Sequence, residues 1–185
     1  AMAWFLLLCT AAPPSVPDAA DTLVVSPAPF VAALQPWIEH RTQQGHRVQL
    51  AAATSSPEAI RTAIRQTARP GRLRYVLLVG DAGPAGQQAA PAATDPRVPT
   101  GRIAAKVNVA WGSEPEIATD NWYADLDDDQ LPDLAIGRLS VDSPGELQTQ
   151  IRKILWYEKY PDPGRWQRQI NLVAGIGSFG TLADT

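Results

Sequence analysis

Carboxylates are crowded into one short stretch of the chain, in a spacing that suits a hard cation. Asp125, Asp127, Asp129 and Asp133 follow the pattern D-x-D-x-D-x-x-x-D, and Asp128 adds a fifth carboxylate within the same nine residues. Like charges this close repel one another, and a divalent cation would remove that cost. Ca²⁺ takes about six to eight oxygen ligands, so alternate side chains of a tightly wound loop could converge on one ion. The sequence therefore predicts a structural Ca²⁺ site whose ligands are Asp125, Asp127, Asp129, the carbonyl of Leu131, and Asp133.

The same loop departs from the EF-hand pattern at two positions. Counted from Asp125, the position that holds a bidentate Glu in an EF-hand is Ile136, and the position that holds Gly is Gln130. Gln130 in place of Gly could weaken the metal site or strain the backbone. The alternative interpretation is an acidic, solvated turn that precedes an apolar strand at Leu134–Ile136.

Side chains for nucleophilic catalysis are scarce. A nucleophile needs a base beside it and a third group that orients the base. The chain has a single thiol, Cys9, and two imidazoles, His40 and His46, which we expect at the surface along the first helix and just past its end. No G-x-S-x-G elbow and no P-loop occurs, and two histidines form no zinc cluster. We therefore expect no catalysis from this chain alone.

A glycine-rich segment provides a weaker alternative. Gly175–Gly180 reads G-x-G-x-x-G and follows an expected strand at Ile170–Ala174. A dinucleotide-binding fingerprint also requires a following helix and an acidic residue about 20 positions later, and the sequence stops before either. Nucleotide binding is therefore the third hypothesis.

Apolar runs separated by helical patterns indicate the fold class. Strands are expected at Thr22–Ser26, Arg47–Ala52, Tyr75–Val79 and Leu134–Ile136; the first is a short apolar, β-branched run and Tyr75–Val79 is the clearest strand. Helices are expected from Phe30 to Gln44, after the N-cap Ser56 with Pro57, and from the capping box at Ser143 to about Tyr160. This order predicts an α/β fold with a doubly wound, mostly parallel sheet covered on both faces.

The remaining segments suggest how the chain is divided. Residues 1–20 form a leader-like segment and a Pro-rich linker, residues 21–164 the first α/β subdomain, and residues 165–185 the start of a second one. The stretch 82–99 is expected to be a long surface loop, and Arg102–Val109 an edge strand of mixed polarity. Asp81 follows a strand at the sheet edge where ligands gather, so it is either a site residue or a turn cap.

Composition excludes several functional classes. The chain has 185 residues, a net charge of −3 and a pI near 5.3, which gives no electrostatic footprint for nucleic acid. One cysteine permits no internal disulfide. The opening AMAWFLLLCTAAPP resembles the apolar core and cleavage zone of a signal peptide and is too short to span a bilayer. This predicts a secreted or cell-envelope protein without a membrane span, the alternative being a frayed terminus.

The order of these motifs resembles the gingipain family of cysteine peptidases, over about Asp21 to Asn171. The segments that carry the resemblance are DTLVVSPAPF, HRTQQGHRV, RYVLLVGDA, ATDNWYADLDDDQLPDLAIGRLSVDSPGEL and KILWYEKY. The resemblance implies a caspase-like fold with two α/β subdomains, secretion, structural calcium, and hydrolysis of polypeptide substrates by a Cys–His dyad. Both dyad residues of the family lie C-terminal to these motifs, so no residue here takes either role. Asp184 lies near the region where arginine-specific members hold the substrate's basic side chain, but the local match does not carry that role across.

Two functions follow as hypotheses. The first is the N-terminal portion of a secreted gingipain-like cysteine endopeptidase, inactive by itself, whose dyad lies downstream. The alternative is a non-catalytic, calcium-stabilised α/β module that serves export or adhesion. The sequence makes no prediction about substrate preference, zymogen processing or oligomeric state.

Overall fold

Short apolar strands alternate with helices through the first part of the chain, and the computed structural model describes residues 19–83, 95–105 and 115–172. The strands are β1 (Thr22–Ser26), β2 (Val48–Ala52), β3 (Tyr75–Val79), β4 (Gly101–Ala104), β5 (Glu116–Thr119) and β6 (Ala135–Leu139). The helices are α1 (Val31–Gln43), α2 (Pro57–Ala68), α3 (Asn121–Ala124) and α4 (Pro144–Lys159), with 3₁₀ turns η1 (Ala28–Phe30) and η3 (Arg165–Arg168).

Two serines start the longer helices, as their sequences predict. The Ser56 hydroxyl accepts a hydrogen bond from the N–H of Ala59 at 3.2 Å, and Pro57 is the first residue of α2. The Ser143 hydroxyl accepts from the N–H of Glu146 at 3.3 Å, and the Glu146 carboxylate accepts from the N–H of Asp142. These bonds satisfy N–H groups that have no partner inside a helix, so the helix boundaries are set locally.

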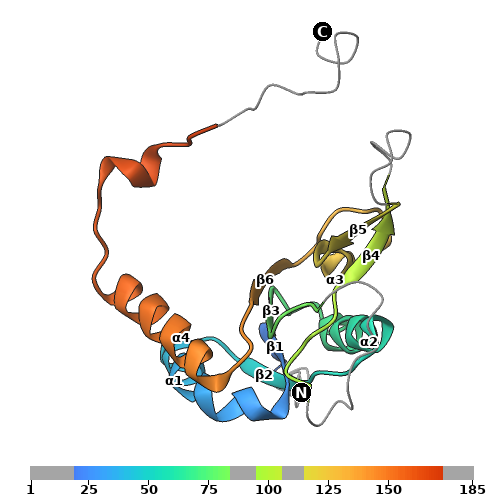
Figure 1. Cartoon of the computed structure of the whole chain (residues 1–185), viewed down its shortest axis with the longest axis horizontal. Coiled ribbons are helices and arrows are strands. Elements are labelled where there is room, and N and C mark those ends of the chain that lie inside the picture. Colours follow the sequence, from blue (N-terminus) through green and yellow to red (C-terminus); the bar gives the residue numbers. More distant parts are fainter. Residues whose placement is uncertain (1–18, 84–94, 106–114, 173–185) are drawn as a thin grey trace, which may run out of the picture.

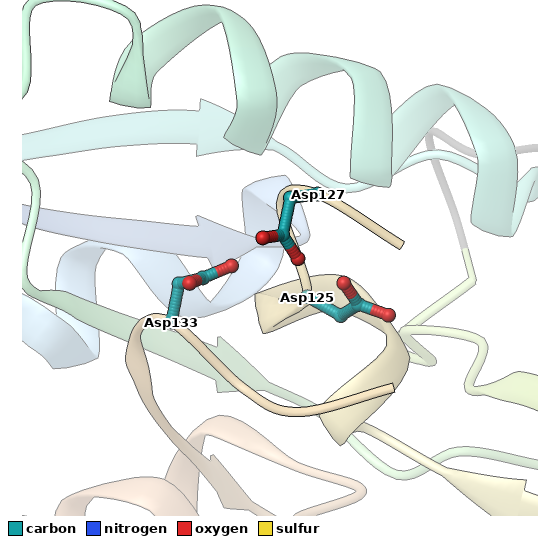
Figure 2. A group of neighbouring side chains, drawn as sticks. All are labelled: Asp125, Asp127 and Asp133. Atoms are coloured by element: carbon teal, nitrogen blue, oxygen red, sulfur yellow. The ribbon is translucent and has the colours of Figure 1, made fainter. Parts of the chain in front are cut away.

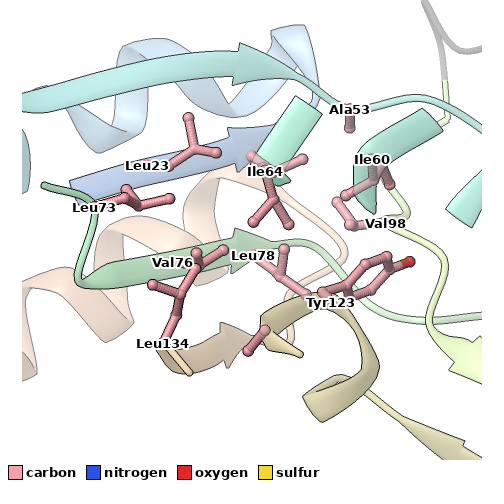
Figure 3. Packing of buried hydrophobic residues seen from close by; sticks show 12 residues of the cluster. Leu23, Ala53, Ile60, Ile64, Leu73, Val76, Leu78, Val98, Tyr123 and Leu134 are labelled. Atoms are coloured by element: carbon pink, nitrogen blue, oxygen red, sulfur yellow. The ribbon is translucent and has the colours of Figure 1, made fainter. Parts of the chain in front are cut away.

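The four predicted strands form one parallel sheet, in the order β2-β1-β3-β6. Successive residues of β1 point to opposite faces: Leu23 and Val25 pack with α2 and α3, whereas Val24 packs with α1 and α4. Figure 1 shows α1 and α4 side by side on one face and α2 on the other. Figure 3 shows the α2 face, where Ile60 and Ile64 lie over Leu23, Val76 and Leu78. The expected α/β sheet with helices on both faces is therefore confirmed.

A second, smaller sheet lies beyond β3. β4 and β5 pair antiparallel, with Ile103 opposite Ile117, and α3 connects β5 to the acidic loop. The expected edge strand at Arg102–Val109 thus begins at Gly101 and belongs to this separate sheet, and residues 106–109 lie outside the described residues. The sequence pattern did not predict β5 or α3, because each spans only four residues.

Residues 160–172, which follow α4, lie away from the sheet (Figure 1). The described part of the expected strand at Ile170–Ala174, residues 170–172, is in no strand, and Ile170 and Leu172 are 86% and 90% exposed. The remainder of that strand and the glycine-rich segment Gly175–Gly180 lie outside the described residues, as do Cys9 and Asp184. Among the helices that the structure describes, none is long and apolar enough to cross a bilayer.

Candidate metal centre

The acidic loop connects α3 to β6 beside helix α2. Asp125 directly follows α3 and is 5% exposed, while Leu134 at the other end of the loop is buried against the α2 face of the sheet. The N–H of Asp133 donates to the carbonyl of Ala124 at 2.9 Å, which closes the loop at its base. The two ends are therefore anchored, and the acidic side chains between them are held in place.

Three carboxylates of this loop converge, as Figure 2 shows. Asp125, Asp127 and Asp133 each offer one oxygen, and these oxygens lie within 4.8 Å of one another. Ca²⁺ binds oxygen at about 2.3–2.6 Å, so two ligands of one ion lie at most about 5 Å apart. The three oxygens are therefore close enough together to be candidates for ligands of one Ca²⁺.

Backbone N–H groups hold the converging carboxylates. Asp125 accepts from the N–H of Asp128 at 2.7 Å and of Gln130 at 3.1 Å. Asp133 accepts from the N–H of Leu126 at 2.7 Å. A carboxylate oxygen has more than one lone-pair direction, so these bonds orient the groups and still leave sites for a cation.

One of the predicted ligands is placed differently. Asp129 is not in the converging group, and its carboxylate accepts from the N–H of Leu131 at 2.7 Å. The part of Asp129 and of the Leu131 carbonyl in a Ca²⁺ site stays a prediction.

Two arginines of α2 clamp the loop from one side. Arg61 Nη2 donates to the carbonyl oxygen of Asp125 at 2.7 Å and lies 2.9 Å from Asp128 Oδ1. Arg65 Nη2 donates to the same Asp128 oxygen at 2.8 Å. The hydrogen bond from Arg65, joined by that from Arg61, lowers the pKa of the Asp128 carboxyl against the opposing effect of burial. Asp128 is therefore a partner of α2 and is not one of the three converging carboxylates.

The charge balance leaves room for a divalent cation. Two guanidiniums face five carboxylates, so three negative charges stay uncompensated in the loop. One bound Ca²⁺ would neutralise most of that excess. The donor set, which consists of oxygens alone, also suits Ca²⁺ better than a transition metal.

Two residues of the loop have left-handed backbone conformations. Asp128 has φ of 69° and Gln130 has φ of 74°. Asp tolerates this region, but Gln is less suited to it than Gly. The expectation that Gln130 occupies a position better suited to Gly therefore fits the observed backbone.

Beside the loop, Arg138 of β6 joins three segments around the end of β3. Its guanidinium makes two bonds with the Asp120 carboxylate, at 2.8 and 2.7 Å. It also donates to the carbonyls of Gly80 at 2.9 Å and Val98 at 2.6 Å. The Arg138 side chain is 10% exposed, so this pair supports the loops at the carboxyl end of β3 from within.

The other polar residues singled out in the sequence have ordinary structural roles. Asp81 is exposed at the end of β3, and its carboxylate accepts from the N–H of Ala82 at 2.8 Å, as a turn cap does. His40 lies 3.1 Å from Glu158 of α4, and His46 lies 3.4 Å from Asp21. Neither imidazole is paired with a nucleophile in the described part of the chain.

Sequence reasoning missed the arginines that organise this region. Arg61 and Arg65 are four residues apart and so share one face of α2, which is a signal for a common partner. Arg138 lies inside a strand, where a charged residue needs a partner to be buried. Neither signal identifies the partner, because Asp120 and Asp128 become neighbours only through the fold.

Comparison with known proteins identifies the family of this chain. Residues 15–185 match the sequence profile of Peptidase family C25. Lys-gingipain and Lys-gingipain 381, both from Porphyromonas gingivalis, are 29% identical to this chain over 169 residues, which is 85% of this chain and 8% of theirs. A solved structure described as "Structure of Protease" superposes with a TM-score of 0.57 at 26% identity, over 80% of this chain and 30% of the other. The chain thus spans less than a tenth of the length of these curated relatives.

The profile match covers nearly the whole chain and includes every described helix and strand. The gingipain resemblance expected from the sequence motifs is confirmed by these comparisons. This chain belongs to Peptidase family C25.

Proposed function

We propose that this chain is the N-terminal portion of a secreted cysteine endopeptidase whose Cys–His dyad lies downstream of Thr185. The observation that carries the proposal is the family match over residues 15–185. The described residues include no cysteine, and His40 and His46 are engaged with Glu158 and Asp21. A polypeptide substrate follows from the peptidase family.

The topology supports a second α/β subdomain after α4. Helices α1 and α4 cover the same face of the sheet. The connection β1-α1-β2 leads away from β3, and parallel crossovers are almost always right-handed. A right-handed crossover through α4 would have to lead from β6 in that same direction, where β3 already lies. A further parallel strand beside β6 is therefore disfavoured, which supports its placement in another sheet.

We further propose that Asp125, Asp127 and Asp133 bind a structural Ca²⁺, with Asp129 and the Leu131 carbonyl completing the shell. Support comes from the convergence of three carboxylate oxygens within 4.8 Å and from the excess negative charge of the loop. The ion would hold together the loop that connects α3 to β6.

Hydrolysis measurements test the peptidase proposal. The 185-residue chain should cleave no fluorogenic peptide, whereas the longer polypeptide from the same reading frame should do so and should lose activity to iodoacetamide. Replacement of Cys9 by Ala should leave the longer polypeptide active. Cleavage by the 185-residue chain that disappears in Cys9→Ala, or a longer polypeptide insensitive to iodoacetamide, would refute the proposal.

A melting comparison tests the metal proposal separately. An ion that binds only the folded loop stabilises it by about 2.7 kcal/mol at a hundredfold excess over Kd. Unfolding should therefore shift to higher temperature in millimolar Ca²⁺ relative to chelator, and the shift should be lost in Asp127→Asn. Mg²⁺ should substitute poorly, because it is smaller and retains its waters. Identical melting with Ca²⁺ and with chelator would leave only an acidic turn.

A further inference from the structure

Two adjoining hollows lie at the amino ends of the strands. The first, of about 510 Å³, is bounded by the segments that lead into β1, β2 and β3, and its lining includes Arg47, Arg72 and Arg74. The second, of about 460 Å³, lies between α1 and the sheet at β3 and β6. His46 and Tyr75 line both, so the two hollows form one continuous surface, which we call the amino-edge surface.

The first hollow is cationic although the whole chain carries a net charge of −3. Arg72 and Arg74 are exposed, and in the described part of the chain neither makes an ion pair. Asp21 is the acid in the lining, and it is already engaged by Thr22, His46 and the N–H of Arg47. A concave surface with one sign of charge attracts counter-charged groups, and guanidinium pairs well with carboxylate.

The second hollow is apolar and uncovered in the residues that the structure describes. Its floor includes Leu77 and Gly137, which face one another across β3 and β6, and its wall includes Trp37 of α1. Gly137 is exposed, and a Cβ built on it would meet nothing within 4 Å. Tyr75 is 44% exposed at the boundary between the two hollows. An apolar groove beside a cationic hollow fits a ligand that carries an apolar group next to acidic groups.

We propose that the amino-edge surface binds an acidic polypeptide segment that carries an apolar side chain beside its carboxylates. The apolar side chain packs between Trp37, Leu77 and Gly137, and the carboxylates pair with Arg72 and Arg74. Charge complementarity supports this occupant. Nucleic acid fits less well, because the cationic area is confined to one hollow of an acidic chain and gives no track for a backbone.

The amino-edge surface lies at the opposite ends of the strands from the carboxyl ends, where ligands of open α/β sheets bind. The proposal rests on this surface alone and does not depend on the peptidase proposal.

Fluorescence anisotropy with a defined probe tests the proposal. The probe is fluorescein-labelled Gly-Phe-Glu-Glu-Glu-Gly, titrated with the 185-residue chain, and its affinity should fall as salt is raised. The double substitution Arg72→Glu with Arg74→Glu should weaken binding by about tenfold or more. The matched control is Arg152→Glu with Lys153→Glu on the exposed face of α4, which makes the same change in net charge and should leave the affinity within about twofold. Circular dichroism melts check that all variants remain folded.

A substitution in the groove separates the apolar part of the proposal from the charged part. Gly137→Val places a branched side chain in open space on a strand, so the fold should be retained. The substitution should weaken binding of the Phe-containing probe by about threefold or more, and it should leave the affinity for a probe with Ser in place of Phe unchanged. Equal losses in the α4 control, or no saturable binding at millimolar chain, would overturn the proposal. If a single-stranded oligonucleotide bound more tightly than the peptide probe, and Gly137→Val did not change its affinity, the assignment of a polypeptide partner would be overturned.

Discussion

Replacement of Arg138 by Met should destabilise the fold far more than replacement of an exposed arginine. Met keeps the length of the side chain but removes the two bonds to Asp120 and the bonds to the carbonyls of Gly80 and Val98. Breaking a buried ion pair by removing one partner costs about 3–5 kcal/mol, because the other charge is left without compensation. The Asp120 side chain is 24% exposed, so water can reach it and the loss should be near 3 kcal/mol.

Urea unfolding followed by tryptophan fluorescence and by circular dichroism measures this loss, and coincident transitions justify two-state treatment. Arg138→Lys keeps the charge but loses the fork geometry, so it should recover only part of the stability. Arg152→Met on α4 is the control: that side chain is exposed, its one hydrogen bond among the described residues is to Thr149 of its own helix, and its loss should be within about 0.5 kcal/mol. If Arg138→Met costs no more than Arg152→Met, the Asp120–Arg138 pair does not support the sheet edge.

Two further predictions concern the loop and the helix pair. Gln130→Gly should stabilise the chain by up to about 1 kcal/mol, because φ of 74° suits Gly better, whereas Gln148→Gly within α4 should cost about 1 kcal/mol. Thermal melts that show the same sign for both would contradict this interpretation of the loop. The hydrogen bonds that Arg41 donates are the main reason that the pKa of the Glu158 carboxyl is lowered from 4.5, and burial opposes this effect. The pair therefore contributes to the free energy of unfolding above pH 4.5, and this contribution is lost as the pH falls through the pKa of the folded state. Arg41→Met should therefore cost more stability at pH 7 than at about pH 3. The difference should be less than about 1 kcal/mol, because the Arg41–Glu158 pair is partly exposed. Equal losses in urea unfolding at the two pH values would argue against a stabilising Arg41–Glu158 pair.

The sequence alone determined the elements whose signals are local. Thr22–Ser26 is a short apolar, β-branched run and Tyr75–Val79 a continuous apolar one, and both are strands with the predicted bounds. Ser56 with Pro57 and Ser143 with Pro144 start helices because a cap and a fixed φ act within a few residues. The class of fold follows from the order of these elements, and the motifs they carry were enough to indicate the family.

Tertiary structure decided which charged groups meet. The D-x-D-x-D spacing treats all alternate carboxylates alike, yet Asp125, Asp127 and Asp133 converge while the Asp129 carboxylate accepts from the N–H of Leu131. The reason is that backbone N–H groups and the arginines of α2, 60 or more residues away in sequence, fix the shape of the loop.

The same holds for the pairs and surfaces built from distant segments. Arg138 and Asp120 face one another because β6 joins the sheet next to β3 and brings α3 and its flanks alongside. The amino-edge surface exists because three separate chain segments enter neighbouring strands at one edge. Strand order is set by long-range pairing and burial, so it cannot be predicted from the propensities of short segments.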